Sequence, residues 1–331
     1  MPGKPQHDDE NPLAADGKEV DTSLASLTLD NSVDKETHML VSSKHLTLAS
    51  PVFKAMLGPA FREGQLLKSE GKLELDLEDD DPKAFEILMN AIHGHISKMP
   101  ETVGFKTFSE LTILVDKYQI LEAIRHYASR WMKALLPQAS TKITTSPISV
   151  ALTCLDMCWV LKLKADFKKI SRILQQGLAC QRTTDGLPIP SFVLEQIQDA
   201  RQQSMNTMIA FIQKMIVDLS SATNTCQTAF HNDRERKNLA CDSLILGSLI
   251  KGLSAHDMWP LPMSPYDGVS LLRLLNKVRN LTIIATCDDT LFGKFSGSSP
   301  DSSHGWAKKL KDEADRVEKA AGGLDLDRLA K

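Results

Sequence analysis

The chain of 331 residues has few cysteines, no long hydrophobic run and no excess of positive charge. No segment approaches the roughly 20 apolar residues that a membrane-spanning helix needs, and the N-terminal residues lack the apolar region of a signal peptide. The six cysteines are widely scattered, which argues against a disulfide framework and for reduced thiols. We therefore expect an intracellular protein of the cytoplasm or nucleus that binds no membrane.

The charge balance gives no reason to expect a nucleic-acid partner. The formal net charge is −3, whereas phosphate binding needs lysines and arginines clustered on one face. Apolar residues make up 42% of the chain and charged residues 24%, as in ordinary globular proteins. The length leaves room for about two domains with a sizeable core in each.

Motifs of catalysis and cofactor binding are missing as well. The sequence contains no Walker loop, no GxGxxG, no GxSxG elbow, no HExxH and no CxxC. It therefore predicts a protein that is not an enzyme and needs no cofactor.

Two groups of residues have ligand types that suit zinc. Cys154 and Cys158 lie one helical turn apart, but their flanks are apolar and no histidine is near, which favours buried structural thiols. The second group has irregular spacing, so whether it holds zinc stays open and no metal site is assigned. Its members are Cys226, His231, Cys241, Cys287 and His304.

The two ends of the chain differ from its middle. Residues 1–36 carry nine acids against three lysines, and residues 1–20 are predicted to be a disordered acidic tail. Residues 290–331 combine a Ser/Gly linker with a terminal amphipathic helix over residues 306–321. This helix has Trp306, Leu310 and Val317 on one side and ends at Gly322 and Gly323.

The first half of the chain predicts short helices around one strand. Ser50 and Asp81 each stand before a proline, a pattern typical of a helix N-cap. Apolar residues then recur at helical spacing after both positions and again over residues 108–118 and 121–135. Residues 72–78 instead alternate leucine with acid, which predicts a strand with one apolar and one solvated face.

Residues 139–289 are expected to be all-helical. A long helix that begins near Ser191 carries a nearly heptad stripe, namely Leu194, Ile197, Met205, Met208, Ile212, Met215 and Leu219. This stripe is typical either of the core of a helical bundle or of a coiled-coil seam for self-association. A proline-rich turn over residues 259–266 either docks a partner or braces two helices.

Several motifs of the first half resemble a BTB/POZ domain, most closely those of filamentous-fungal BTB proteins. The motifs are Val41-Ser-Ser-Lys-His-Leu46, Ser50-Pro-Val-Phe53, the strand ending Leu75-Asp-Leu77, the helix opening Asp79-Asp-Asp-Pro-Lys-Ala-Phe-Glu86, and Leu114-Val-Asp-Lys-Tyr118. The resemblance covers about residues 36–136 and implies an α+β fold. In this fold a BTB/POZ domain over residues 21–138, a small sheet flanked by helical hairpins, precedes an all-α C-terminal region over residues 139–289.

One departure from the family concerns its first strand. Only residues 20–29, with Asp21 as the candidate aspartate, are available to form it, so this strand is degenerate or missing. A missing first strand leaves an exposed sheet edge, and such edges invite pairing with another chain.

The resemblance implies a protein-protein interaction adaptor that forms homodimers or heterodimers. Val52, Phe53, Met56 and Leu57 belong to the helical hairpin nearest the expected dimer face. Cullin-binding relatives carry a hydrophobic residue followed two positions later by Glu, whereas here Glu86 follows Phe85 directly. Two alternatives stay open: a substrate adaptor for a cullin-type ubiquitin ligase, and a metal-dependent or enzymatic regulator in the C-terminal helices.

Overall fold

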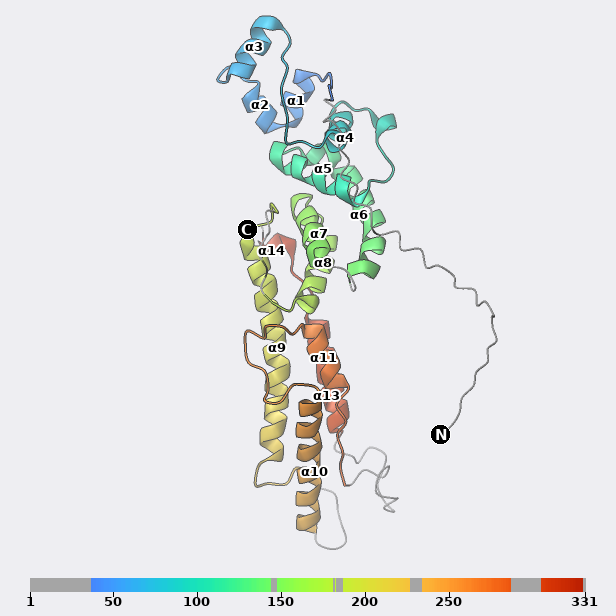
Figure 1. Cartoon of the computed structure of the whole chain (residues 1–331), viewed down its shortest axis with the longest axis vertical. Coiled ribbons are helices and arrows are strands. Elements are labelled where there is room, and N and C mark those ends of the chain that lie inside the picture. Colours follow the sequence, from blue (N-terminus) through green and yellow to red (C-terminus); the bar gives the residue numbers. More distant parts are fainter. Residues whose placement is uncertain are drawn as a thin grey trace, which may run out of the picture. The chain divides into compact units, whose positions relative to one another are not determined.

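The computed structural model describes residues 37–143, 148–180, 182, 187–226, 234–286 and 305–329. Within these ranges every regular element is a helix and no strand is present (Figure 1). The predicted α+β fold with a BTB/POZ sheet is therefore wrong. The acidic tail at residues 1–20, the candidate first strand at residues 20–29 and the Ser/Gly linker lie outside the described residues.

The first half of the chain folds into short helices. They are α1 (Ser43–Ala49), α2 (Pro51–Met56), α3 (Arg62–Glu70), α4 (Pro82–Ile92), the 3-10 helix η1 (Ile96–Lys98), α5 (Phe105–Tyr118) and α6 (Leu121–Ile143). Both predicted N-caps are confirmed: the Ser50 hydroxyl accepts a hydrogen bond from the backbone N–H of Phe53 at 3.0 Å, and the Asp81 carboxylate accepts one from Ala84 at 2.8 Å. The helices thus begin where serine or aspartate satisfies their first N–H groups.

Residues 72–77 run as an extended stretch between α3 and α4 (Figure 1) but are not a strand. Leu73, Leu75 and Leu77 are half-buried and the acids between them are exposed, so the alternation of faces is present. A strand additionally needs a neighbouring chain segment to complete its backbone hydrogen bonds, and no described segment pairs with this one. The alternating pattern predicted correctly which side chains are exposed, but the predicted strand is wrong.

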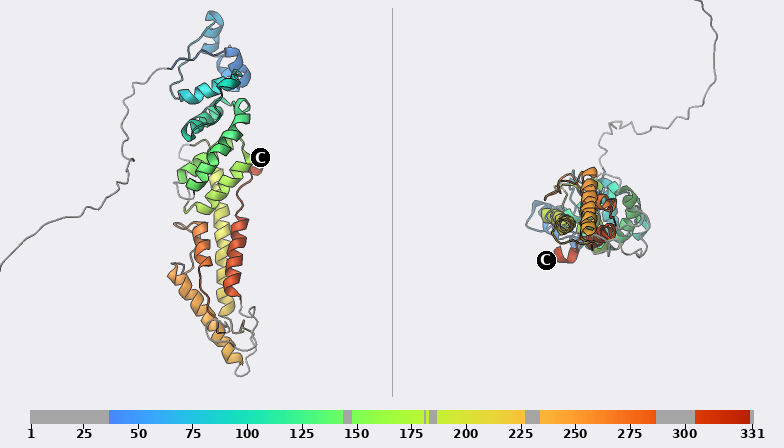
Figure 2. Two further views of the ribbon diagram at one scale, coloured as in Figure 1. Left: turned by 90° about the vertical axis from the view of Figure 1, so that its right-hand side faces the viewer. Right: turned by 90° about the horizontal axis from the view of Figure 1, so that it is seen from below.

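The second half is helical, as expected. Its helices are α7 (Ile148–Val160), α8 (Lys164–Gly177), α9 (Ser191–Leu219), α10 (Arg234–Ala255), α11 (Leu271–Arg279), α13 (Trp306–Ala320) and α14 (Leu326–Leu329). The long helix α9 contacts α8, α10, α11 and α13, and Figure 2 shows it in yellow beside α13 in red. No helix in the described ranges has the length and apolar character to cross a membrane.

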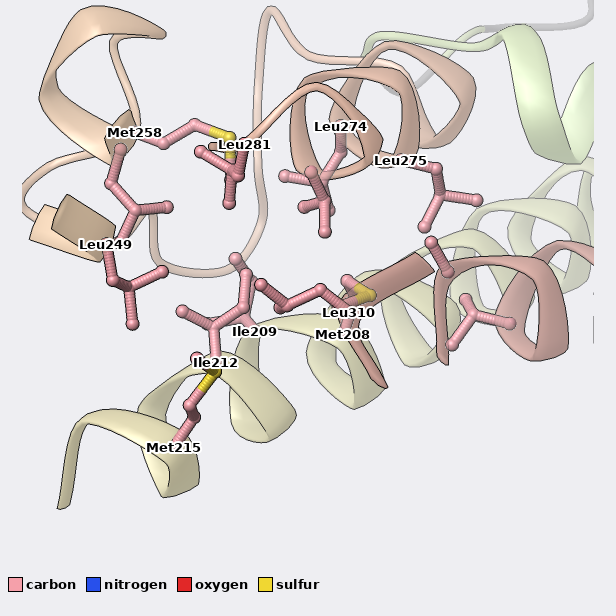
Figure 3. Packing of buried hydrophobic residues seen from close by; sticks show 14 of the residues in the cluster. Met208, Ile209, Ile212, Met215, Leu249, Met258, Leu274, Leu275, Leu281 and Leu310 are labelled. Atoms are coloured by element: carbon pink, nitrogen blue, oxygen red, sulfur yellow. The ribbon is translucent and has the colours of Figure 1, made fainter. Parts of the chain in front are cut away.

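The heptad-like stripe of α9 forms the core of this bundle. Met208, Ile212 and Met215 are buried, and Figure 3 shows them together with Leu249 of α10 and Leu310 of α13. Because these side chains are covered by helices of the same chain, the bundle-core interpretation is confirmed over a seam for self-association.

The C-terminal helix α13 is part of the same bundle. Leu310 and Val317 are buried, so the predicted apolar side of this helix is confirmed. The residues after it are tied to α8: the Ser171 hydroxyl accepts a hydrogen bond from the backbone N–H of Leu324 at 2.9 Å, and the Gln175 side chain accepts one from Gly323 at 3.3 Å.

Replacement of Gly323 by alanine is expected to lower the free energy of unfolding by about 2 kcal/mol, since left-handed strain and a backbone clash add together. Gly323 has a φ of +78°, and a β-carbon there would lie 2.1 Å from the carbonyl oxygen of Lys168. Urea denaturation measures the change. Gly177→Ala is the matched control, because a β-carbon there meets nothing within 4 Å. Equal stability of the two variants would contradict this account of the C-terminal contact.

Candidate interaction surfaces

The structure separates the predicted interaction residues into two groups. Phe53 and Phe85 are only 1% and 8% exposed. Their rings lie 4.4 Å and 6.3 Å, centroid to centroid, from the ring of Tyr118. Both therefore belong to the core of the first half, where their rings are inaccessible to a partner.

The remaining predicted residues are accessible to different degrees. Val52, Met56 and Leu57 are half-buried, and Glu86 is exposed. The ring of Phe85, the hydrophobic residue next to Glu86, is buried, so Glu86 has no exposed aromatic ring beside it in the chain. Of the predicted apolar surface, only Val52, Met56 and Leu57 along one edge of α2 are still partly accessible.

Larger apolar side chains are exposed on either side of α2 in the chain. Leu48 at the end of α1 is 86% exposed and Phe61, which precedes α3, is 51% exposed. In α3 itself only Gly64 is buried. Periodicity missed both side chains, because helical spacing alone does not identify which short helices lack a neighbour.

A tight turn fixes α3 to α2. A β-carbon on Gly64 would lie 1.9 Å from the carbonyl oxygen of Gly58, so the two backbones approach closely at a place where only glycine fits. The backbone N–H of Phe61 donates to the carbonyl of Gly58 at 3.3 Å. The exposed ring of Phe61 therefore projects from a well-defined turn.

The extended segment of residues 72–77 is held at both ends. Gly71, at a φ of +74°, ends α3 and donates to the carbonyl of Leu67. At the other end the Asp80 carboxylate accepts hydrogen bonds from Lys117 at 2.7 Å and from the Tyr118 hydroxyl at 2.5 Å. Burial, with this hydrogen bond and the negative charge of Asp80, raises the pKa of Tyr118. The segment between these anchors contains no hydrogen-bonded backbone group from residue 72 to residue 76 in the described structure.

The second half offers a shallow cationic groove along α11. It has a volume of about 350 Å³ and is lined by side chains that include His256, Arg273, Asn276 and Lys277, with no acid among the lining residues. The Lys277 ammonium donates a hydrogen bond to the carbonyl of His256. Two cations and an amide on one helix face suit a carboxylate or a phosphate.

The proline-rich turn predicted near residue 259 is braced by a buried arginine. Arg201 of α9 donates hydrogen bonds to the carbonyl oxygens of Tyr266 and Val269, both at 2.7 Å. Trp259 and Met263 of the same loop are exposed. The bracing alternative fits the base of this loop, while its tip faces solvent.

The buried ionisable residues that sequence reasoning missed include Arg201 and Asp156. Arg201 occupies a position of the α9 stripe, four residues after Ile197 and four before Met205. Asp156 lies inside the apolar run of α7 and is 2% exposed. In both places a charged residue occupies a helix position whose neighbours one turn away are buried and apolar, and this pattern could have identified it.

The thiols of α7 are structural. Cys154 and Cys158 are buried, and burial raises the pKa of Cys154 to about 11 and that of Cys158 well above its ordinary value. A thiol with a raised pKa is a poor nucleophile and a poor metal ligand. The prediction of buried structural thiols is confirmed.

The open zinc question is answered only in part. Cys226 and Cys241 are both buried in the core around α9 and α10. His231, Cys287 and His304 lie outside the described residues. Within the described ranges no three His, Cys, Asp or Glu side chains gather in a way that would hold a metal ion.

Comparisons with known proteins give no match. No protein family matches this chain, and neither a curated protein nor a solved structure does. The resemblance to BTB/POZ proteins is therefore without independent support.

Proposed function

We propose that the protein is a non-enzymatic protein-protein interaction adaptor that self-associates through its first helices. The observation that supports this proposal is the exposure of Leu48 and Phe61 on α1 and at the start of α3. Single exposed apolar residues are ordinary. Here two large ones lie, in the chain, on either side of Val52, Met56 and Leu57, which are half-buried, and the proposed surface combines all five.

The proposed contact joins two copies of the chain. In a two-fold interface each side chain contributes twice, so even a small apolar surface becomes substantial. A stable interface needs at least about 1,000 Å² of well-packed contact. The half-buried edge of α2, framed by Leu48 and Phe61, is the centre of this contact, and Phe53 behind it keeps the helix in place.

The second contact of the adaptor is assigned to the helical C-terminal half. The loop over residues 256–270 exposes Trp259 and Met263 and contributes His256 to the groove of α11. Aromatic residues and methionine are common in protein-binding surfaces. A client with an acidic group near an apolar side chain fits this combination.

The double variant Leu48→Ser, Phe61→Ser is expected to weaken self-association at least ~100-fold, since two apolar side chains are lost from each copy. Light scattering on the full chain at tens of micromolar measures it, with the unchanged protein expected as a dimer. Leu239→Ser is the matched control, because Leu239 is an exposed leucine on α10. A strict monomer of the unchanged chain, or equal effects of Leu239→Ser, would contradict self-association through this surface.

A further inference from the structure

The segment of residues 72–78 has the features of a docking edge for a β-strand. Its backbone runs extended from residue 72 to residue 77 (Figure 1), and no backbone group from residue 72 to residue 76 has a hydrogen-bond partner in the described structure. Unpaired extended backbone is a template for another strand. We propose that a partner protein adds one β-strand here, with lysine or arginine at alternate positions and apolar residues between them. The inference rests on the proposed adaptor function and identifies the chemistry of one partner.

The conformation of this edge is already set before a partner arrives. Gly71 fixes its start and the Asp80 carboxylate, bound by Lys117 and Tyr118, fixes its end. At about 3.3 Å per residue, the six residues from 72 to 77 span roughly 20 Å, the length of an ordinary strand. Because the ends are held, little ordering of this segment is needed when a strand pairs with it.

The side chains define which strand fits. Leu73, Leu75 and Leu77 are half-buried, whereas Glu74, Asp76 and Glu78 are exposed. Side chains directly opposite each other in paired strands interact, and opposite charges stabilise the pair. A partner strand therefore places cations opposite the three acids and apolar residues opposite the leucines, where they extend the same half-buried layer.

The charge disfavours a second copy of this chain as the occupant. Residues 72–81 hold six acids and one lysine. In an antiparallel pair centred on Leu75, Glu74 would face Asp76 of the other copy in both directions, and like charges opposite each other are destabilising. The edge therefore favours a cationic strand. Self-association is assigned to the surface of α2 together with Leu48 and Phe61.

Binding of a synthetic strand to the full chain tests the proposal. The probe is a fluorescent seven-residue peptide that alternates lysine and valine, and fluorescence anisotropy at low salt measures its affinity. We expect it to bind at least ~10-fold tighter than a peptide of four lysines followed by three valines, because only the alternating order matches both faces. N-methylation of alternate backbone nitrogens in the probe should abolish this preference, as it removes strand donors.

Two variants test the same edge from the protein side. Leu75→Pro removes a backbone N–H that has no partner among the described residues, so the fold should persist by circular dichroism while peptide affinity falls at least ~10-fold. The charge reversal Glu74→Lys, Asp76→Lys, Glu78→Lys leaves the backbone intact and should transfer the preference to an alternating glutamate and valine peptide. This second variant keeps the test valid if proline disturbs folding.

Several results would overturn the inference. Equal affinity for the alternating and block peptides would reduce binding to general electrostatic attraction. Binding only after removal of residues 1–36 would assign the edge to the chain's own N-terminal segment, and a dimer abolished by Leu75→Pro would assign it to a second copy. A chain that self-associates through Leu48 and Phe61 but ignores the alternating peptide would overturn this inference alone and leave the adaptor proposal standing.

Discussion

Replacing Arg201 by leucine is expected to lower the free energy of unfolding by about 4 kcal/mol, the largest loss predicted for this chain. Arg201 is fully buried, with 0% of its surface exposed. Its guanidinium donates to the carbonyls of Tyr266 and Val269 at 2.7 Å, and at longer distances to Ala179 and Pro265. Leucine would leave the carbonyl of Val269 without a donor and would leave that of Tyr266 with only the backbone N–H of Val269 at 3.4 Å.

The buried charge of Arg201 is compensated mainly by the dipoles of the backbone carbonyl groups that accept its hydrogen bonds. Burial lowers the pKa of Arg201, and the negative charge of Asp267 opposes this effect. The planar guanidinium reaches several carbonyl groups at once, which a lysine ammonium cannot do from the same backbone position. Arg201→Lys is therefore expected to fall between the leucine variant and the unchanged protein.

Urea denaturation and amide hydrogen exchange together measure the role of Arg201. Exchange should increase first over residues 258–270, since the loop loses its attachment to α9 before the helices separate. Arg172→Leu is the matched control, because Arg172 is exposed on α8. If Arg201→Leu were as stable as Arg172→Leu, the carbonyl contacts would not contribute to stability.

The same residue shows how far the sequence predicts this fold. The stripe of α9 predicted the buried residues from Leu194 to Leu219, because helical periodicity follows directly from which side faces the core. It passed over Arg201, whose partners are backbone carbonyls of residues more than sixty positions later. Every residue has a backbone carbonyl, so the residue types do not reveal which carbonyls accept hydrogen bonds from Arg201. The pattern of the sequence therefore could not predict this contact.

The extended segment of residues 72–77 shows the opposite case. Its alternation predicted which side chains are half-buried and which are exposed, and both are observed. Pairing depends on a second segment, which the pattern of one segment cannot specify. Likewise, Phe53 and Phe85 were recognised as apolar residues on helix faces, but their common partner Tyr118 lies on a third helix. The surface prediction failed for these two because adjacency in space was unknown.

Asp156→Asn is expected to stabilise the protein by about 2 kcal/mol at pH 7.5, a gain that comes from removing a buried charge. Asp156 of α7 is 2% exposed, and one of its carboxylate oxygens has no hydrogen-bond partner. Burial and the nearby charge of Asp116 raise the pKa of Asp156 from 3.8 to about 6, while a hydrogen bond from the backbone of Ile189 opposes the shift. At neutral pH the folded protein therefore contains an ionised group in an unfavourable place.

The pH dependence follows from the raised pKa. Below pH 4 the carboxyl is protonated in both the folded and the unfolded chain, so burial carries no charge penalty. As the pH rises from about 4 to about 6 the unfolded chain loses its proton first, and the folded state loses about 3 kcal/mol relative to it. Asparagine removes this loss, although its amide N–H needs a new acceptor, which reduces the net gain at neutral pH.

Thermal unfolding of Asp156→Asn and the unchanged chain between pH 4.5 and pH 8 measures the effect. The difference in Tm should be roughly 4–8 °C at pH 7.5 and should decrease steadily toward pH 4.5. Asp199→Asn is the matched control, since Asp199 is exposed on α9 and its replacement should change Tm little at any pH. A difference for Asp156→Asn that does not vary with pH would mean that the carboxyl is not the group whose ionisation destabilises the fold.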